Sequence, residues 1–159
     1  VFKTPADNRT DYIKRLIGMP GDKIQFIEGI LHINNVPVIR EQVKTSEPIR
    51  CGKFILKNET FKETLPNGVT HLATYNIEGT MKNTKIYQVP KGHYFLMGDN
   101  RDCSKDSRYL NDVGYVQNLN LVGKAKIIFF SNDTKKGSLL KFWNLDNSFR
   151  LKRTFRRLD

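Results

Sequence analysis

The sequence lacks long apolar stretches and has few side chains of the kinds that bind metals. No run approaches the roughly 20 apolar residues that a membrane-spanning helix needs, and no secretory signal peptide is visible. The two cysteines, Cys51 and Cys103, form no Cys-x-x-Cys pair, and the three histidines have no metal-ligand spacing. We therefore expect neither a metal ion nor another cofactor. The cysteines could form one disulfide, but sequence alone does not show whether they are close.

Acidic residues are scarce beside basic ones, 16 against 27, so the net charge is +11. Such a surplus favours an anionic membrane surface, nucleic acid or acidic protein as partner, although a basic solvated surface has the same charge. Binding of single-stranded nucleic acid would need aromatic side chains interleaved with a Lys/Arg stripe. Here Tyr94 and Phe95 lie in an apolar run typical of a core, so nucleic acid is not an expected partner. A non-enzymatic basic β-barrel that binds nucleic acid remains an alternative.

The sequence also lacks repeats, low-complexity tracts and any clear amphipathic helix, and is built of short β-rich runs between turn residues. The runs "KIQFI", "ILHI" and "VPVI", separated by Glu28-Gly29 and Asn34-Asn35, predict a three-stranded meander. Pro20-Gly21 predicts a type II turn after a strand over 12–18. The run "LVGKAKIIFF" predicts another strand, and a final strand with a basic tail is expected after it.

These features predict an all-β fold in two parts. Residues 1–40 and 86–159 are expected to form a partly open antiparallel β-barrel or sandwich core. Residues 41–85 are more polar and turn-rich, and we interpret them as a smaller inserted β-subdomain. Within it, Asn67-Gly68 is a strong hairpin signal between "FKETL" and "VTHLATY".

Lys14 is the first candidate for chemistry. It lies inside the predicted strand "DYIKRLIG", whose apolar residues Ile13, Leu16 and Ile17 occupy both faces and so predict burial on both sides. Burial removes water from the ammonium group and lowers its pKa, and a neutral amine is a usable general base. The alternative is a lysine that extends into solvent from an edge strand.

A dense charged loop, "MGDNRDCSKDSR" at 97–108, is the second candidate. Arg15 needs a carboxylate if it is buried, and Asp99 and Asp102 are available; Asp106 and Arg108 are close enough to pair with each other. Such pairs would hold the loop backbone, so that the short hydroxyls of Ser104 and Ser107 could be aimed at the lysine amine. The aspartate spacing lacks the glycine and terminal glutamate of an EF-hand, so calcium is not expected.

The stretches "YIKRLIGMPGD", "GHYFLMGDNRDCSKDSR" and "GYVQNLNLVGKA" resemble boxes of the bacterial type I signal peptidases. The resemblance covers most of the chain outside the predicted insertion. It implies a membrane-tethered β-domain on the outer face of the bacterial cytoplasmic membrane. That domain would remove signal peptides from exported preproteins, with a serine nucleophile and a lysine base.

The resemblance also implies roles for individual residues. Lys14 matches the general base, and Ser104 matches a serine that orients it. The residues implied to support the site are Arg15, Asp99, Arg101, Asp106 and Arg108. The residues implied to bind substrate are Asp11, Tyr12, Ile13 and Met97. Cys103 replaces the asparagine of many relatives, and no role is implied for Cys51.

The nucleophile of this family lies in an upstream Ser-Met-x-Pro box, and none of the six serines here has that context. Because Val1-Phe2 resembles the end of that box, we expect the chain to begin inside a longer protein and to have no peptidase activity alone. Two alternatives are other Ser-Lys peptidases with a related β-core, namely a self-cleaving repressor or a conjugation-type peptidase.

Overall fold

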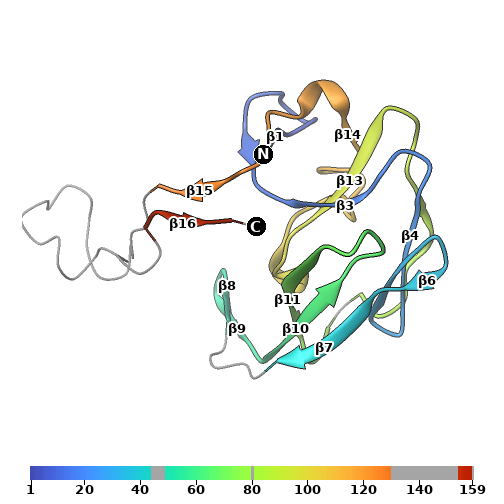
Figure 1. Cartoon of the computed structure of the whole chain (residues 1–159), viewed down its shortest axis with the longest axis vertical. Helices are drawn as coiled ribbons and strands as arrows, with labels where there is room; N and C mark the ends of the chain where they lie inside the picture. The colour runs from blue at the N-terminus through green and yellow to red at the C-terminus, as the bar shows by residue number, and fades with distance from the viewer. Residues whose placement is uncertain (44–48, 80, 130–153, 159) are drawn as a thin grey trace, which may run out of the picture. The chain divides into compact units, whose positions relative to one another are not determined.

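The computed structural model describes residues 1–43, 49–79, 81–129 and 154–158. The chain divides into two compact units, Val1–Val122 and Gly123–Asp159. The described residues form strands β1 to β16 and two short 3-10 turns, η1 (Arg101–Cys103) and η2 (Asn118–Asn120), which confirms the predicted all-β class. The strands belong to six antiparallel sheets, none of which closes on itself within the described part (Figure 1). In that part no helix is long and apolar enough to cross a membrane.

The predicted meander is confirmed in a four-stranded sheet of order β12–β4–β5–β6. Its strands are β4 (Lys23–Ile27), β5 (Ile30–Ile33), β6 (Val36–Pro37) and β12 (Tyr87–Gln88). Glu28, Gly29, Asn34 and Asn35 all have positive φ, between 49° and 75°. Positive φ at both central residues is the conformation of the tight hairpin turn that matches strand twist, which explains why Gly and Asn occur there.

A three-stranded sheet of order β14–β13–β3 carries both candidate segments. It contains β3 (Arg15–Gly18), β13 (His93–Met97) and β14 (Val116–Gln117). Among the described strands β3 pairs with β13 alone, and the pairing ends with Met97 opposite Arg15. Nearby in sequence, β1 (Phe2–Lys3) pairs with β2 (Asp11–Tyr12). The register therefore brings the chain before β3 beside the chain after β13.

The residues between β6 and β12 form two further sheets. One has the order β11–β10–β7, with β7 (Ile39–Val43), β10 (Asn58–Thr64) and β11 (Thr70–Asn76); the other is the hairpin of β8 (Ile49–Cys51) and β9 (Phe54–Leu56) (Figure 1). The hairpin turn predicted at Asn67-Gly68 is confirmed, with φ of +80° at Gly68. The bounds of an inserted subdomain over 41–85 stay a prediction.

The second unit differs from the prediction. Its described strands are only β15 (Ile127–Ile128) and β16 (Arg156–Arg157), which pair with each other. A continuous strand over "LVGKAKIIFF" was therefore the wrong prediction. Gly123 interrupts that run, and Ile127 is exposed, so the run lacks a buried face to hold it in a longer sheet. The expected C-terminal strand and basic tail, 142–159, lie mostly outside the described residues.

Two apolar clusters form the core of the first unit. The larger contains Ile17 of β3 and Phe95 and Met97 of β13, packed with residues of the meander sheet. The smaller contains Phe2 of β1 and Leu96 of β13. Since β13 contributes to both clusters, its end at Met97 is held firmly, and the charged loop begins directly after it.

Candidate active site

Lys14 lies in the two-residue connection between β2 and β3 and not inside a strand as the sequence predicted. Its neighbours Ile13 and Leu16 are 68% and 43% exposed, so the predicted burial on both faces was also wrong. The reason is that β3 is an edge strand of its sheet. In the described part of the chain it has a neighbouring strand, β13, on one side only. Lys14 itself is partly buried, and its Nζ lies 5.5 Å from the centre of the Tyr12 ring.

The environment of Lys14 favours a neutral amine. Burial lowers the pKa of Lys14 below its ordinary value, and the nearby positive charge of Arg108 acts in the same direction. The carboxylates of Asp106 and Asp99 partly offset this effect. The charged residues that act on the amine of Lys14 therefore all belong to the loop that follows β13.

Arg15 and Asp99 form a bidentate ion pair between these two segments. Arg15 Nε lies 2.7 Å from one carboxylate oxygen of Asp99, and Nη2 lies 2.9 Å from the other. This geometry explains why the pKa of Arg15 is raised, because Asp99 accepts two hydrogen bonds from the guanidinium. Asp102, the other partner considered for Arg15, instead accepts the backbone N–H of Asn76 at 2.7 Å.

Asp106 and Arg108 form a second ion pair, which is almost fully buried. Arg108 Nε lies 2.8 Å from Asp106 Oδ1, and Asp106 also accepts the backbone N–H of Gly98 at 2.9 Å. Burial opposes the charge of Arg108, but the bond to Asp106 outweighs it and raises the pKa of Arg108. Ser107 is equally buried, and its Oγ accepts the backbone N–H of Leu96 at 3.0 Å. The second half of the loop is therefore fastened to β13.

Ser104 packs directly against Gly98, in the space that a side chain at position 98 would fill. A Cβ placed on Gly98 would lie 2.1 Å from Ser104 Oγ, so only glycine allows this approach. Continuing the antiparallel register by one residue beyond Met97 and Arg15 sets Gly98 opposite Lys14. The sequence elements predicted to form one site thus meet at this point.

The hydroxyl of Ser104 is buried and has no hydrogen-bond partner among the described residues. A hydrogen bond from Ser104 to Lys14, as the sequence suggested, is not formed in this structure. Leaving a buried hydroxyl unpaired costs about 1–3 kcal/mol, which calls for an explanation in a native site.

Arg101 has partners that sequence reasoning missed. It is 1% exposed, and its Nη2 lies 2.6 Å from Glu63 Oε2 while Nη1 donates to the hydroxyl oxygen of Tyr75 at 2.8 Å. Nε2 of His71 lies 3.2 Å from the same Glu63 oxygen. Burial raises the pKa of Glu63, but the bond to His71 and the charge of Arg101 outweigh it, so the pKa lies below its ordinary value. Glu63 lies on β10 between the exposed Lys62 and the partly buried Thr64, and no local pattern distinguishes it from a surface glutamate.

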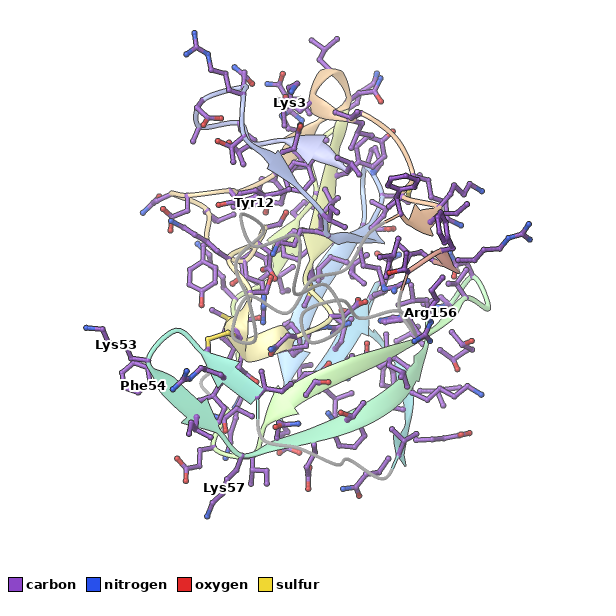
Figure 2. All side chains as sticks on the ribbon, turned by 90° about the vertical axis from the view of Figure 1, so that its left-hand side faces the viewer. Lys3, Tyr12, Lys53, Phe54, Lys57 and Arg156 are labelled. Atoms are coloured by element: carbon purple, nitrogen blue, oxygen red, sulfur yellow. A yellow bond between two sulfur atoms is a disulfide. The ribbon has the colours of Figure 1, made fainter. Side chains whose placement is uncertain are left out.

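Cys51 and Cys103 form a disulfide, with their Cα atoms 5.6 Å apart. Figure 2 shows it as a yellow bond between the β8–β9 hairpin, which carries Lys53 and Phe54, and the loop that holds η1. The bond spans 52 residues of sequence and ends next to Ser104. Sequence reasoning left this pairing open, since the two cysteines have no spacing motif.

The residues expected to bind substrate differ in exposure. Asp11 and Ile13 are exposed and Tyr12 is partly exposed, in β2 and at the residue that follows it. Met97 is fully buried in the larger core cluster, so in this structure its side chain is not available to a peptide on the surface. Its core packing explains the difference. Within the described ranges, no group of three or more His, Cys, Asp or Glu side chains could hold a metal ion.

Comparison with known proteins identifies the family of the chain. The family model "Signal peptidase, peptidase S26" matches residues 1–130. A signal peptidase I of Rickettsia typhi is 43% identical over 82% of this chain and 50% of its own length. Another, of Rickettsia canadensis, is 43% identical over 99% of this chain and 63% of its own length.

A solved structure of a signal peptidase I from Enterococcus faecalis shares 26% identity, with a TM-score of 0.43, over 77% of this chain and 87% of that one. The chain spans about half to two thirds of the length of these curated relatives. On the strength of the family match over 1–130, the chain belongs to the signal peptidase family, peptidase S26.

Proposed function

We propose that these residues form the base-bearing part of a membrane-associated serine endopeptidase that removes signal peptides from exported preproteins. Lys14 is its general base, and Ser104 orients the amine. The observation that supports this most is the partly buried Lys14, whose pKa is lowered, facing a loop that holds a buried and unpaired serine hydroxyl. Hydrogen bonds in a resting site are often long and shorten only in the substrate complex, so the gap between Ser104 and Lys14 is compatible with this role.

The reaction has two steps. Neutral Lys14 takes the proton of the nucleophilic serine while that oxygen bonds to the scissile carbonyl carbon, and the protonated amine then gives the proton to the leaving nitrogen as the C–N bond breaks. Lys14, neutral again, takes a proton from the water that attacks the acyl ester carbon, and the protonated amine then returns this proton to the serine oxygen as the ester C–O bond breaks. No cofactor is needed for either step.

We infer that the nucleophile is a serine in a Ser-Met-x-Pro context, which none of the six serines in residues 1–159 has. Ser107 is committed to the backbone of β13, and Ser104 is buried behind Gly98. Neither has the sequence context of the family's nucleophile. Residues 1–159 alone are therefore expected to cleave no preprotein, since a base accelerates the reaction only when a hydroxyl is present to lose its proton.

The substrate is an extended peptide with small side chains before the cut. Asp11 and Ile13 are exposed, and β3 is an edge strand in the described part of the chain, so this segment suits pairing with an extended peptide. Shallow apolar pockets would reject bulky side chains by steric clash.

The site works at the outer face of the bacterial cytoplasmic membrane. The Cys51–Cys103 disulfide supports an oxidising compartment. The β8–β9 hairpin supports an anionic membrane surface as partner, because Phe54 and Ile55 are 73% and 69% exposed and lie among Arg50, Lys53 and Lys57 with no acidic residue in 49–57. Figure 2 shows Lys53 and Phe54 pointing away from the body of the molecule.

Cleavage of a preprotein by the full-length protein tests this function. Lys14→Ala and Lys14→Arg should each lower kcat/KM by at least about 100-fold, since neither side chain is a neutral base, and Ser104→Ala should have a smaller effect. Lys23→Arg, on the exposed side of β4, serves as the control and should leave the rate unchanged. Near wild-type rates in both Lys14 variants would refute the assignment.

A further inference from the structure

The three residues before Ser104 are each attached to the segment between β7 and β12. Arg101 pairs with Glu63 of β10, and Asp102 accepts the backbone N–H of Asn76 at the end of β11. The backbone contributes as well, because the N–H of Thr74 donates to the carbonyl of Asp99 at 2.7 Å. η1 is also linked to the second half of the loop, because Nη2 of Arg108 donates to the backbone carbonyl of Arg101.

Cys103, the third residue before Ser104 to be considered, is attached covalently. Cys103 is the last residue of η1 and is bonded to Cys51 at the end of β8, while the residue that follows it is Ser104. Cys51 also pairs with Phe54 across the hairpin turn, so the disulfide fastens η1 to a second sheet. A three-residue 3-10 turn has little stability of its own, and its position depends on such attachments.

After Ser104 the loop is attached instead to the sheet β14–β13–β3. Asp106 binds the N–H of Gly98, and the N–H of Ser107 donates to the carbonyl of Leu96 at 3.0 Å. Ser104 therefore lies at the junction between a stretch held by β8, β10 and β11 and a stretch held by β13. Among the residues that the structure describes, its hydroxyl has no hydrogen-bond partner to fix its direction. The backbone on either side must set its direction.

We propose that Cys51 and Cys103 are positioning residues for the lysine base. Their disulfide fixes the main chain beside Ser104 so that its hydroxyl stays directed at Lys14 during catalysis. The β8–β9 hairpin, which carries Cys51, thus supports the position of Ser104. This inference rests on the proposed function of Lys14 and Ser104.

The test compares the double variant Cys51→Ala/Cys103→Ala with the wild type in the full-length protein, using one preprotein substrate. Loss of the tether should lower kcat about tenfold with little change in KM, because a small displacement of a positioning group costs rate and not binding. The rising limb of kcat/KM against pH should move to higher pH, because a misdirected hydroxyl no longer favours the neutral amine.

A matched control separates positioning from general destabilisation. Gly68→Ala strains the β10–β11 turn, where φ is +80° and no atom lies within 4 Å of the new Cβ. It should lower Tm but leave kcat and the pH profile unchanged at 25 °C. If the cysteine variant also lowers only Tm, the disulfide is merely structural and the proposal is wrong.

The Ser104→Ala background shows whether the disulfide acts through Ser104. There, removal of both cysteines should lower kcat by less than about twofold, since the group to be positioned is already absent. A full tenfold loss in that background would overturn the proposal. If the double variant does not fold, reduction of the folded wild type, followed by thiol titration, should produce the same loss of kcat.

The outcomes also separate this inference from the proposed function. A wild type whose activity depends on Lys14 but not on the cysteines contradicts only the role of the disulfide. Cleavage that is indifferent to Lys14 contradicts both.

Discussion

The Nη2 atom of Arg101 lies 2.6 Å from Oε2 of Glu63, and each side chain is only 1% exposed. Because water reaches neither group, each charge depends on the other for compensation. The pair connects the turn before Ser104 to β10, so it supports the position of the candidate active-site loop as well as the fold. Tyr75 and His71 contribute further polar contacts to the pair.

Replacing Glu63 should be strongly destabilising. Glu63→Gln keeps the shape of the side chain but leaves the Arg101 charge buried without compensation, which we expect to lower the free energy of unfolding by about 3 kcal/mol. Urea unfolding measures the loss. Glu41→Gln on β7 is the control, because Glu41 is exposed and should change stability by less than about 0.5 kcal/mol. Equal effects of the two changes would contradict the burial of the pair.

Stability should fall at acid pH partly through Glu63. Its pKa is lower in the folded state than in the unfolded state, where it is near 4.5. The unfolded state therefore binds more protons between these two values, and stability rises with pH across that window. The contribution is complete above the unfolded pKa and is lost as pH falls through the folded one. Urea unfolding from pH 6 to pH 3 should show a flatter acid limb for Glu63→Gln than for the wild type; parallel limbs would contradict this.

Gly98 should tolerate no side chain while Ser104 is present. A new Cβ would lie 2.1 Å from Ser104 Oγ and 2.4 Å from its Cβ, so Gly98→Ala must displace Ser104. We expect a loss of about 1–3 kcal/mol in stability together with a loss of activity in the full-length protein. Gly98→Ala/Ser104→Gly removes both clashing atoms and should recover the stability but not the activity. Failure to recover stability would mean that the clash lies elsewhere.

The β8–β9 hairpin should bind anionic lipid. Phe54→Ser/Ile55→Ser should weaken binding to vesicles that contain phosphatidylglycerol, because two exposed apolar side chains lose their place in the interface. Sedimentation with vesicles measures the effect, and pure phosphatidylcholine vesicles should bind less in every case. Leu72→Ser, at 57% exposure on β11, is the control. If that control weakens binding as much as the hairpin change does, the hairpin is not the contact.

Local chemistry made much of the fold predictable. The turns at Glu28-Gly29, Asn34-Asn35 and Asn67-Gly68 depend on residues that accept positive φ, and each is found where the sequence indicates it. The strand around Lys14 was predicted too long, because apolar residues on both sides of a run do not reveal that the strand lies at a sheet edge. Ile13 and Leu16 are exposed for that reason.

Long-range partners could not be predicted in the same way. Glu63 and Arg101 are 38 residues apart, and Cys51 and Cys103 are 52 apart. No periodicity connects such residues, and only the packing of β10 and the hairpin against η1 brings them together. Arg15 and Asp99 were identifiable as a pair because a resemblance to a known family linked their two segments.

The most direct test of the central claim is the titration of Lys14 itself, followed by NMR of its labelled side chain in the full-length protein with Lys14→Arg to assign the signal. Because burial disfavours the ammonium form, the pKa of Lys14 should lie below its ordinary value of 10.5. A Lys14 midpoint at or above 10.5 would contradict its role as the general base.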